Sequence, residues 1–421
     1  MAAPPGGPPD STPPHIVAVE PDSGALLPDW KGDAVVQFDE VIDEMASGAT
    51  PTPGGPIAGL AAQIVLSPVG GPVKVSWHRS VIRIRPAEGW KLGRVYHLQI
   101  LPGIRDLRHN VMKQGRLIVF STGPVLPHAS LAGTVLQWAE QRAVAKAVIR
   151  AARQPDTAAY VTIADSGGEF LLTDIPPGRY HVVAIQDDNG NRALDRSEAF
   201  DSTTLTVDST ARAVFYAFVH DTAGPKLRAA DPSDSMTVRL SFSEPLDLSH
   251  RVDTARVHLF ALPDTALVPL AGVWSGAQYD SLEARARAVA DSLHRAADTS
   301  AHRARSDSAK AGAPRPPPPA PPLPAAGPPR AARGAGRDTL VHVDTARIHA
   351  LLRARAVPGD RVILRTARPL GPGRRYLVRV HGIANLSGAL ADGQALFIVP
   401  VPSAKPARAD TTRARPHPKA P

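Results

Sequence analysis

Residues 166–191 read SGGEFLLTDIPPGRYHVVAIQDDNGN, a run of turn, strand, turn, strand and polar loop. Phe170 and Leu172 stand two residues apart, and the same spacing resumes at Tyr180 and Val182 after a Pro-Pro-Gly triplet. A period of two is typical of strands, because successive side chains point to opposite faces. The triplet favours a tight turn. The stretch therefore predicts a β-meander, and the rest of the chain flanks it as two similar halves.

Residues 168–184 resemble the hairpin that marks the carboxypeptidase-regulatory, transthyretin-like β-sandwich, with the motif G-x-F-x-[LI]-x-x-[LI]-x-x-G-x-Y. The resemblance covers about residues 131–219 and implies a carboxypeptidase-regulatory-like sandwich over 128–220. That family is a non-catalytic module found beside enzymes, receptors and surface proteins. The resemblance therefore implies a fold and says little about a role.

Residues 15–124 hold short strand-like runs between Pro and Gly turns, which predict another β-sandwich. Motifs in this region are similar to those of the bacterial Ig-like domain of surface-layer proteins, and they imply that fold. The motifs are Pro21 to Gly24, Phe38 to Asp43, Leu92 to Tyr96, Gly103 to Asp106 and Phe120 to Gly123.

The same motifs return near the C-terminus, and this internal repetition predicts a second Ig-like sandwich over 222–400. Trp77 and Trp274 stand in matching places, so we expect them to pack equivalently in the two cores. The repeated segments are Phe242 to Asp247, Pro369 to Val380 and Gly382 to Asn385.

An insertion at about 275–360 separates Trp274 from its partner strand in this second copy. Residues 279–310 carry apolar side chains at spacings of three and four, which indicate an amphipathic helix. The Pro- and Ala-rich residues 311–336 are predicted to be disordered, and 338–356 offer a short strand or helix. The insertion is interpreted as a flexible spacer or a weak basic contact to anionic surface polymer; the alternative is a tolerated hairpin insertion.

Composition agrees with an all-β chain of tandem sandwiches: 44 Pro and 33 Gly in 421 residues, with 5% aromatic residues. The absence of cysteine excludes disulfides, thiolate metal sites and a cysteine nucleophile. The formal charge of +9 comes from Arg residues spread through the tail and the insertion, so no nucleic-acid partner is expected. The sequence contains no run of 18 apolar residues, so no membrane span is expected.

Residues 1–14 and 401–421 are predicted to be a disordered tether and a disordered tail. The first of these has neither the basic nor the apolar region of a signal peptide. It resembles the Pro/Gly-rich tether that follows the lipidated cysteine of bacterial envelope lipoproteins, in which case a lipid anchor would lie upstream. The alternative is a plain disordered N-terminus.

One constellation predicts a metal site. Asp187, Asn189, Asn191, Asp195 and Glu198 fall at positions 1, 3, 5, 9 and 12 of a twelve-residue loop, the spacing with which oxygen ligands converge on Ca²⁺. Position 6 departs from the EF-hand-like pattern because it holds Arg where that pattern has Gly. The alternative is an Asx-rich turn whose side chains bond local backbone amides.

No nucleophile elbow, phosphate loop, dinucleotide fingerprint or zinc-protease motif occurs in the sequence. We therefore expect a non-enzymatic protein of the bacterial cell envelope, a structural or adhesive spacer with an envelope polymer or protein as partner. The alternative is a carbohydrate- or polymer-binding accessory module for an envelope enzyme. Exposed aromatic platforms would distinguish the two, and the candidates are Trp30, Trp90 and Trp138.

Overall fold

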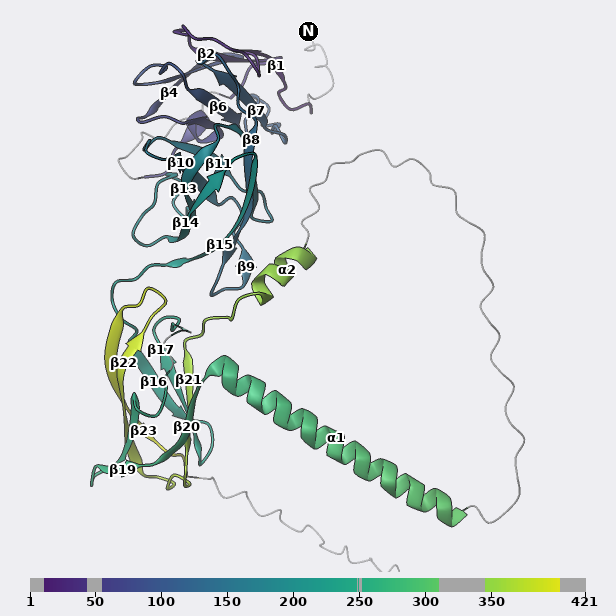
Figure 1. The fold of residues 1–421 in the computed structure, drawn as a ribbon, viewed down its shortest axis with the longest axis vertical. Coiled ribbons are helices and arrows are strands. Elements are labelled where there is room, and N and C mark those ends of the chain that lie inside the picture. The colour runs from purple at the N-terminus through teal and green to yellow at the C-terminus, as the bar shows by residue number, and fades with distance from the viewer. Residues whose placement is uncertain (1–10, 44–54, 248, 250–251, 310–344, 402–421) are drawn as a thin grey trace, which may run out of the picture. The chain divides into compact units, whose positions relative to one another are not determined.

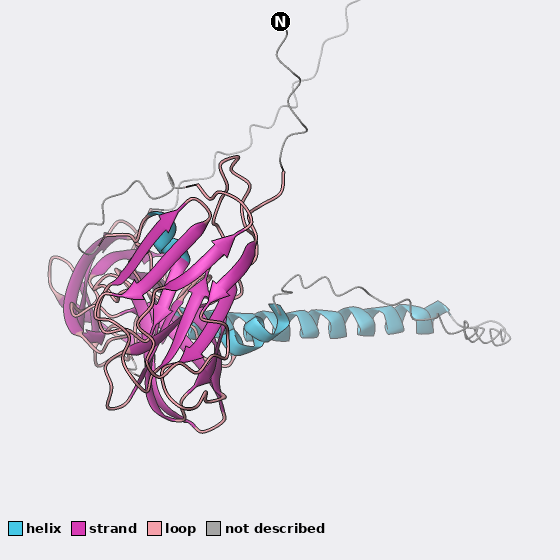
Figure 2. Cartoon of the chain, turned by 90° about the horizontal axis from the view of Figure 1, so that it is seen from above, coloured by secondary structure: helices cyan, strands magenta, loops and turns pink. Residues whose placement is uncertain are grey.

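The computed structural model describes residues 11–43, 55–247, 249, 252–309 and 345–401. The chain is all-β, with strands as the dominant elements (Figure 2). It divides into two compact units. Of the described residues, the first comprises those up to 221 together with 345–357, and the second comprises those from 222 to 309 and from 358 to 401 (Figure 1). The predicted disordered segments at 1–14, 311–336 and 401–421 lie almost wholly outside the described residues.

The first unit begins with a sandwich whose four-stranded sheet, in the order β1-β2-β5-β4, and three-stranded sheet, β3-β6-β7, share one apolar core. A 3-10 helix, η2 (Gly59–Gln63), precedes β3. We call these two sheets and their shared core the N-terminal sandwich. Its strands are β1 (Ile16–Glu20), β2 (Ala34–Phe38), β3 (Ile64–Ser67), β4 (Val73–His78), β5 (Val81–Pro86), β6 (Val95–Ile100) and β7 (Arg116–Ser121).

A second core of the first unit belongs to what we call the middle sandwich, with the strand order β11-β10-β13-β14-β15-β8-β12. The pairing of β15 with β8 is parallel, and β9 pairs with β8. The strands are β8 (Ala129–Gln137), β9 (Arg142–Ala143), β10 (Val148–Arg153), β11 (Ala159–Ile163), β12 (Glu169–Ile175), β13 (Gly178–Ile185), β14 (Ala199–Val207) and β15 (Thr210–Val219).

The predicted pairing of the two central strands is wrong. β12 pairs with β8, whereas β13 pairs with β10 and β14. The prolines at 176 and 177 have no N–H to close a hairpin ladder, and the Tyr180 hydroxyl donates to the Pro176 carbonyl at 2.6 Å. Phe170 and Val182 still lie in one core. The period of two therefore correctly identified which faces of the strands are buried. It did not identify the pairing partners, because these depend on how the strands on either side of the core are arranged.

The second unit holds the C-terminal sandwich, with sheets ordered β16-β17-β21-β20 and β19-β18-β22-β23. The first of these repeats the order β1-β2-β5-β4 of the N-terminal sandwich. The strands are β16 (Leu227–Pro232), β17 (Thr237–Phe242), β18 (Val257–Ala261), β19 (Ala266–Val268), β20 (Leu270–Ser275), β21 (Arg361–Thr366), β22 (Arg375–Ala384) and β23 (Leu390–Ile398).

The repeated motifs make equivalent hydrogen bonds in the N-terminal and C-terminal sandwiches. Tyr96 accepts the Lys91 amide at 2.7 Å through its hydroxyl, and Tyr376 accepts the Gly371 amide in the same way at 2.8 Å. A buried Asp106 or Asn385 side chain accepts two backbone amides of the turn that follows it. The repetition in sequence is therefore also a repetition of structure.

The two tryptophans are not equivalent, in contrast to the prediction. Trp77 packs against the core of the N-terminal sandwich. Trp274 pairs with Ile363, whose neighbours Val362 and Leu364 are the core residues of that strand, so the Trp274 ring lies on the opposite face. The register of β20 shifts between residues 270 and 272. A shift of one residue moves a side chain to the other face of a sheet.

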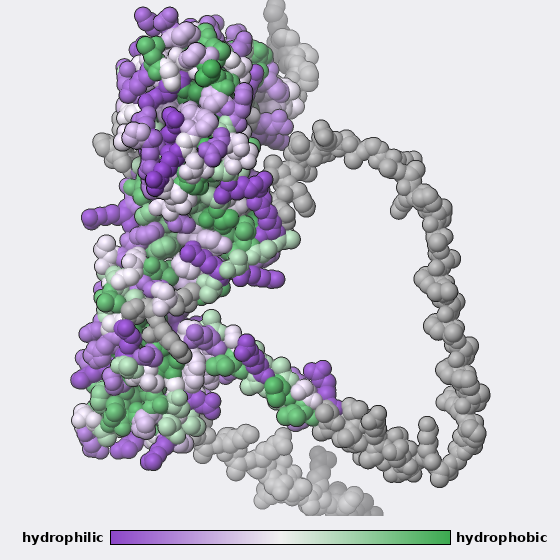
Figure 3. Space-filling model, in the orientation of Figure 1, coloured by the Kyte–Doolittle hydropathy of each residue, from purple (hydrophilic) through white to green (hydrophobic). Residues whose placement is uncertain are grey.

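The insertion contains two helices, α1 (Gly276–Ala309) and α2 (Thr345–Arg353). The helix expected at 279–310 thus corresponds to α1, along which hydrophobic and hydrophilic side chains are mixed at the surface (Figure 3). The short strand or helix expected at 338–356 contains α2. Among the described residues, neither helix has the length and apolarity needed to cross a membrane.

Candidate functional site

The loop from Asp187 to Glu198 brings the predicted ligand residues together, and their oxygens accept hydrogen bonds from N–H groups. The Asp187 carboxylate accepts the amides of Gly190 at 2.9 Å, Asn191 at 3.1 Å and Arg192 at 2.9 Å. Both Glu198 oxygens accept backbone amides, at 3.2 and 3.1 Å, and the Glu198 side chain is buried. These are the bonds of an Asx-rich loop.

The remaining three residues complete this network. Asn189 and Asn191 each donate a side-chain N–H to Asp195, at 2.6 and 2.8 Å. The side-chain oxygen of Asn191 accepts the Ala193 amide at 2.7 Å. Within the described residues, no group of three or more His, Asp or Glu side chains is arranged to hold a metal ion. Calcium binding by this loop stays a prediction, and a cation would have to displace these bonds.

Position 6 of the loop has a role that the sequence analysis missed. Arg192 adopts φ 57°, the left-handed conformation for which the calcium pattern uses Gly. Its guanidinium donates to the Ile64 carbonyl at 2.6 Å and to the Ala62 carbonyl, both in the N-terminal sandwich. Burial lowers the pKa of Arg192. The Asx bonds thus hold a loop that places the Arg192 guanidinium on the neighbouring sandwich. In the sequence, the indication of this contact was an arginine at a turn position that favours glycine.

Further contacts continue this junction between β3 and β6 on one side and β11 and its neighbouring loops on the other. The Val161 amide donates to the Ser67 hydroxyl at 3.0 Å. Arg94 forms an ion pair with Asp156 at 2.8 Å. The ring of His97 lies 5.1 Å from the Tyr160 ring, measured between centroids. The N-terminal and middle sandwiches are therefore joined by apolar, polar and charged contacts.

His97 lies in this junction and has a strongly lowered pKa. The side chain is buried, and burial lowers its pKa to about 4 despite the nearby Asp174 carbonyl. It is therefore neutral at neutral pH and behaves as a packing residue.

The acidic residues of the repeated motifs Phe38 to Asp43 and Phe242 to Asp247 make turn and strand-end hydrogen bonds. Asp39 accepts the His15 amide at 2.8 Å, and Asp247 accepts the Ser249 amide at 2.8 Å. Glu244 accepts the side-chain amide of Asn385 at 3.2 Å.

The three candidate aromatic platforms are all partly buried. Trp90 donates its ring N–H to the Gly32 carbonyl at 2.7 Å, and both Trp90 and Trp30 pack against the core of the N-terminal sandwich. Trp138 donates to the Ala356 carbonyl at 3.0 Å and lies under the Arg355 guanidinium, 4.4 Å from the ring centroid. Contacts with the protein therefore occupy part of each ring.

Helix α2 occupies the middle sandwich although its residues are inserted within the C-terminal one. Ile348 and Leu352 are buried against Leu136 of β8. The Tyr216 hydroxyl donates to the Leu351 carbonyl at 2.9 Å, and Arg347 pairs with Glu169 at 2.8 Å. Within the described residues, the chain passes from one unit to the other at 221–222 and at 357–358.

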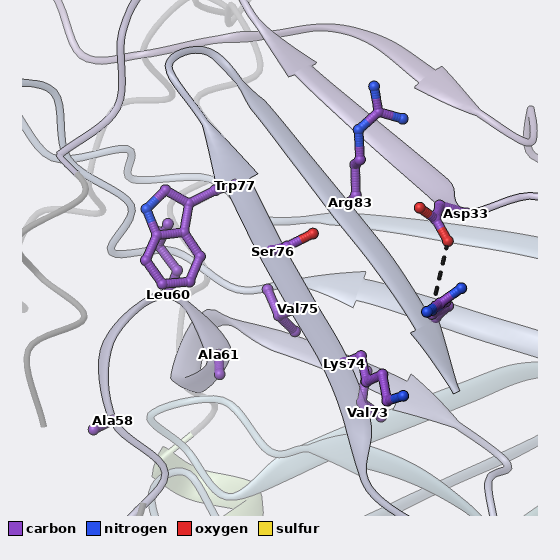
Figure 4. A pocket seen from close by; sticks show the side chains of 11 residues that line it. Asp33, Ala58, Leu60, Ala61, Val73, Lys74, Val75, Ser76, Trp77 and Arg83 are labelled. Atoms are coloured by element: carbon purple, nitrogen blue, oxygen red, sulfur yellow. Dashed lines mark ion pairs between the residues drawn. The ribbon is translucent and has the colours of Figure 1, made fainter. Parts of the chain in front are cut away.

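A groove of about 600 Å³ runs along β4 of the N-terminal sandwich. Figure 4 shows Trp77 and Val75 on the same side of the strand as Leu60 and Ala61, and Arg83 on the other side. One wall is therefore apolar and the other is cationic.

Residues 10–122 match the family described as "Bacterial Ig-like domain". No curated protein matches the chain. Among solved structures, the major pilin subunit BcpA of Bacillus cereus has 10% identity, covers 48% of this chain and 70% of its own, and has a TM-score of 0.17. The Bacillus anthracis TIE protein has 10% identity, and the match covers 61% of this chain and 47% of that protein with a TM-score of 0.16. Native alpha-2-macroglobulin of Escherichia coli has 12% identity, and the match covers 61% of this chain and 86% of that chain with a TM-score of 0.17.

Proposed function

We propose that the chain is a non-catalytic spacer of a bacterial cell envelope, in which the N-terminal and middle sandwiches act as one rigid body. The observation that carries this proposal is the junction made by Arg192, Ser67 and Arg94. A flexible pair of modules would leave such groups solvated, because their ordering costs conformational entropy. A spacer gains from the rigidity, since a stiff connection keeps a distal surface at a defined distance.

The family match at residues 10–122 supports the bacterial Ig-like assignment of the N-terminal sandwich. By extension we assign the C-terminal sandwich, which repeats its strand order, to the same kind, and the middle sandwich to the carboxypeptidase-regulatory-like kind. The bacterial Ig-like match supports the proposed location in the cell envelope. In the producing bacterium, protease added to cells with a permeabilised outer layer should degrade the chain while a cytoplasmic marker stays intact. Protection equal to that of the marker would refute the location.

Scanning calorimetry of the full chain tests the rigid junction. The N-terminal and middle cores should unfold in one transition, separate from that of the C-terminal sandwich. Arg192→Gly should split that transition in two. Independent unfolding of the two cores in the unsubstituted chain would remove the basis for a rigid spacer.

A second candidate is binding of an anionic envelope polymer. A groove of about 340 Å³ places Trp30 and Trp90 beside Lys31, Lys74 and Arg85. Electrophoresis through gels containing an acidic or a neutral polysaccharide tests it. Retardation by the acidic polymer that is lost in Lys31→Glu would support this function, and equal mobility in both gels would exclude it.

A further inference from the structure

Strand β4 is an edge of its sheet and has no strand on its outer side among the described residues. It pairs only with β5, in the register His78↔Val81, Ser76↔Arg83 and Lys74↔Arg85. Its six residues give about 20 Å of open edge at about 3.3 Å per residue. An open edge is a template for a further strand.

The tight turn between β4 and β5 fixes which backbone groups face outward. Residues 79 and 80 form a two-residue turn, so the flanking pair His78 and Val81 exchanges hydrogen bonds. Bonded pairs alternate along an antiparallel ladder. The N–H and C=O groups of Val73, Val75 and Trp77 therefore point away from β5, toward the open edge.

The side chains along this edge form two unlike walls. Those that share the core side with η2 are apolar and only half buried, although they belong to core strands. Those on the outer side are polar, and three of them are cationic. The apolar wall consists of the half-buried Val73, Val75, Trp77 and Ala61 and the fully buried Leu60, and the outer wall of Lys74, Ser76, Arg83 and Arg85 (Figure 4).

The outer wall carries more positive than negative charge. Arg85 lies 3.8 Å from Asp33, a contact between partly exposed groups that contributes little. Within the described residues, Lys74 and Arg83 form no ion pair. Among the described residues that line the groove, Asp33 is the one acidic side chain against three cations. A ligand that brings carboxylates to this wall is therefore favoured, and a second copy of the same cationic edge is disfavoured.

We propose that the β4 edge is a docking site for an extended peptide segment of another protein, in which apolar and acidic residues alternate. Such a segment adds a strand to the sheet by bonding Val73, Val75 and Trp77. Its apolar residues fill the groove beside Leu60, and its acidic residues meet Lys74 and Arg83. The row of backbone donors and acceptors favours a peptide over an anionic polysaccharide, because only a peptide matches that spacing.

Fluorescence anisotropy with the full chain tests this site. The probe is a labelled octapeptide of four Glu-Val repeats. Comparison peptides have four Lys-Val repeats, or four Glu followed by four Val, and polygalacturonate serves as an anionic polymer. We expect the alternating acidic peptide to bind at least about tenfold more tightly than either comparison peptide, since one charge-assisted bond alone is worth about that factor. Hydrogen exchange should show protection of residues 73–77 on binding.

Two variants separate backbone pairing from charge. Val75→Pro removes an outward N–H and leaves the ladder with β5 intact, so peptide binding should fall about tenfold or more. Arg83→Glu should weaken binding similarly, whereas Arg365→Glu, on the corresponding strand of the C-terminal sandwich, should not. If Val75→Pro proves unfolded by circular dichroism, Arg83→Glu and the exchange experiment decide. Absence of peptide binding at millimolar concentration, equal binding of the block and alternating peptides, or competition by polygalacturonate without protection of β4 would each overturn the proposal.

Discussion

Arg192 is the residue on which the junction of the first unit depends most. Its φ of 57° suits glycine, so Arg192→Gly relaxes the backbone while removing two charged hydrogen bonds. We expect a net loss of about 3 kcal/mol in the free energy of unfolding of the first unit, measured by denaturant titration. Arg196→Gly, an exposed change in the same loop, is the control. Equal stability of the two variants would show that the guanidinium contributes nothing.

His97 predicts an acid-sensitive junction. The folded chain binds a proton at this ring only near pH 4, because burial lowers the pKa, whereas the unfolded chain binds it near 6.5. Lowering the pH from 6.5 to 4 therefore favours the unfolded state, by up to about 3 kcal/mol. Below pH 4 this contribution stays constant. His97→Gln should show a correspondingly smaller loss of stability over that range in parallel denaturant titrations, and an identical pH profile would contradict the assignment.

The Asx loop makes a prediction that holds whether or not calcium binds. Asp187 accepts three backbone amides, so Asp187→Ala should lower the melting temperature of the first unit in a calcium-free buffer. Asp174→Ala, outside the loop, is the comparison.

Added calcium then tests the metal prediction itself. If Asp187, Asp195 and Glu198 bind Ca²⁺, millimolar Ca²⁺ should raise the melting temperature of the full chain, and Glu198→Ala should abolish that rise. If the residues serve only as Asx bonds, calorimetry should show neither heat nor stabilisation.

At the scale of the element, the sequence predicted which strands exist better than it predicted how they pair. The alternation around Phe170 and Tyr180 correctly placed both side chains in one core. It could not show that β12 and β13 have different partners, because pairing depends on residues distant in sequence. The prediction that Trp274 lies in the core was wrong for a related reason, since the register shift of β20 near Gly272 turns this side chain outward.

Gly272 is required by that outward ring. A Cβ at this position would lie 2.3 Å from the Trp274 ring, closer than real atoms approach. Gly272→Ala should therefore destabilise the C-terminal sandwich by about 1–3 kcal/mol in denaturant titrations. Gly359→Ala, where the added Cβ meets no atom within 4 Å, is the control. Addition of Trp274→Ala to Gly272→Ala should restore part of the loss, and an unchanged loss would place the ring elsewhere.

Helix α2 should behave as part of the first unit. Ile348 and Leu352 are buried, whereas His349 on the same helix is exposed. Leu352→Asp should raise hydrogen exchange over residues 345–353 and change the fluorescence of the tryptophans, because a buried charge without a partner detaches the helix. His349→Asp should change neither. Equal exchange in the two variants would mean that α2 is not docked. The apolar spacing of 338–356 predicted such an element, but its docking partner lies more than a hundred residues away in sequence.

In the whole molecule, we expect the N-terminal and middle sandwiches to move as one body. The repeat and the family match could be anticipated from motifs, because these motifs encode turns and buried tyrosines locally. The junction could not, since Arg192 and its two carbonyl partners are about 130 residues apart and no local pattern links them.

Distance measurement between two spin labels tests this rigidity most directly. The chain has no cysteine, so Lys113→Cys and Thr203→Cys, both exposed, give one labelled pair across the junction in the full protein. We expect a single narrow distribution of distances, which broadens when Arg192→Gly is added. A broad distribution in the chain that retains Arg192 would show that the two sandwiches move independently, and would contradict the rigid spacer.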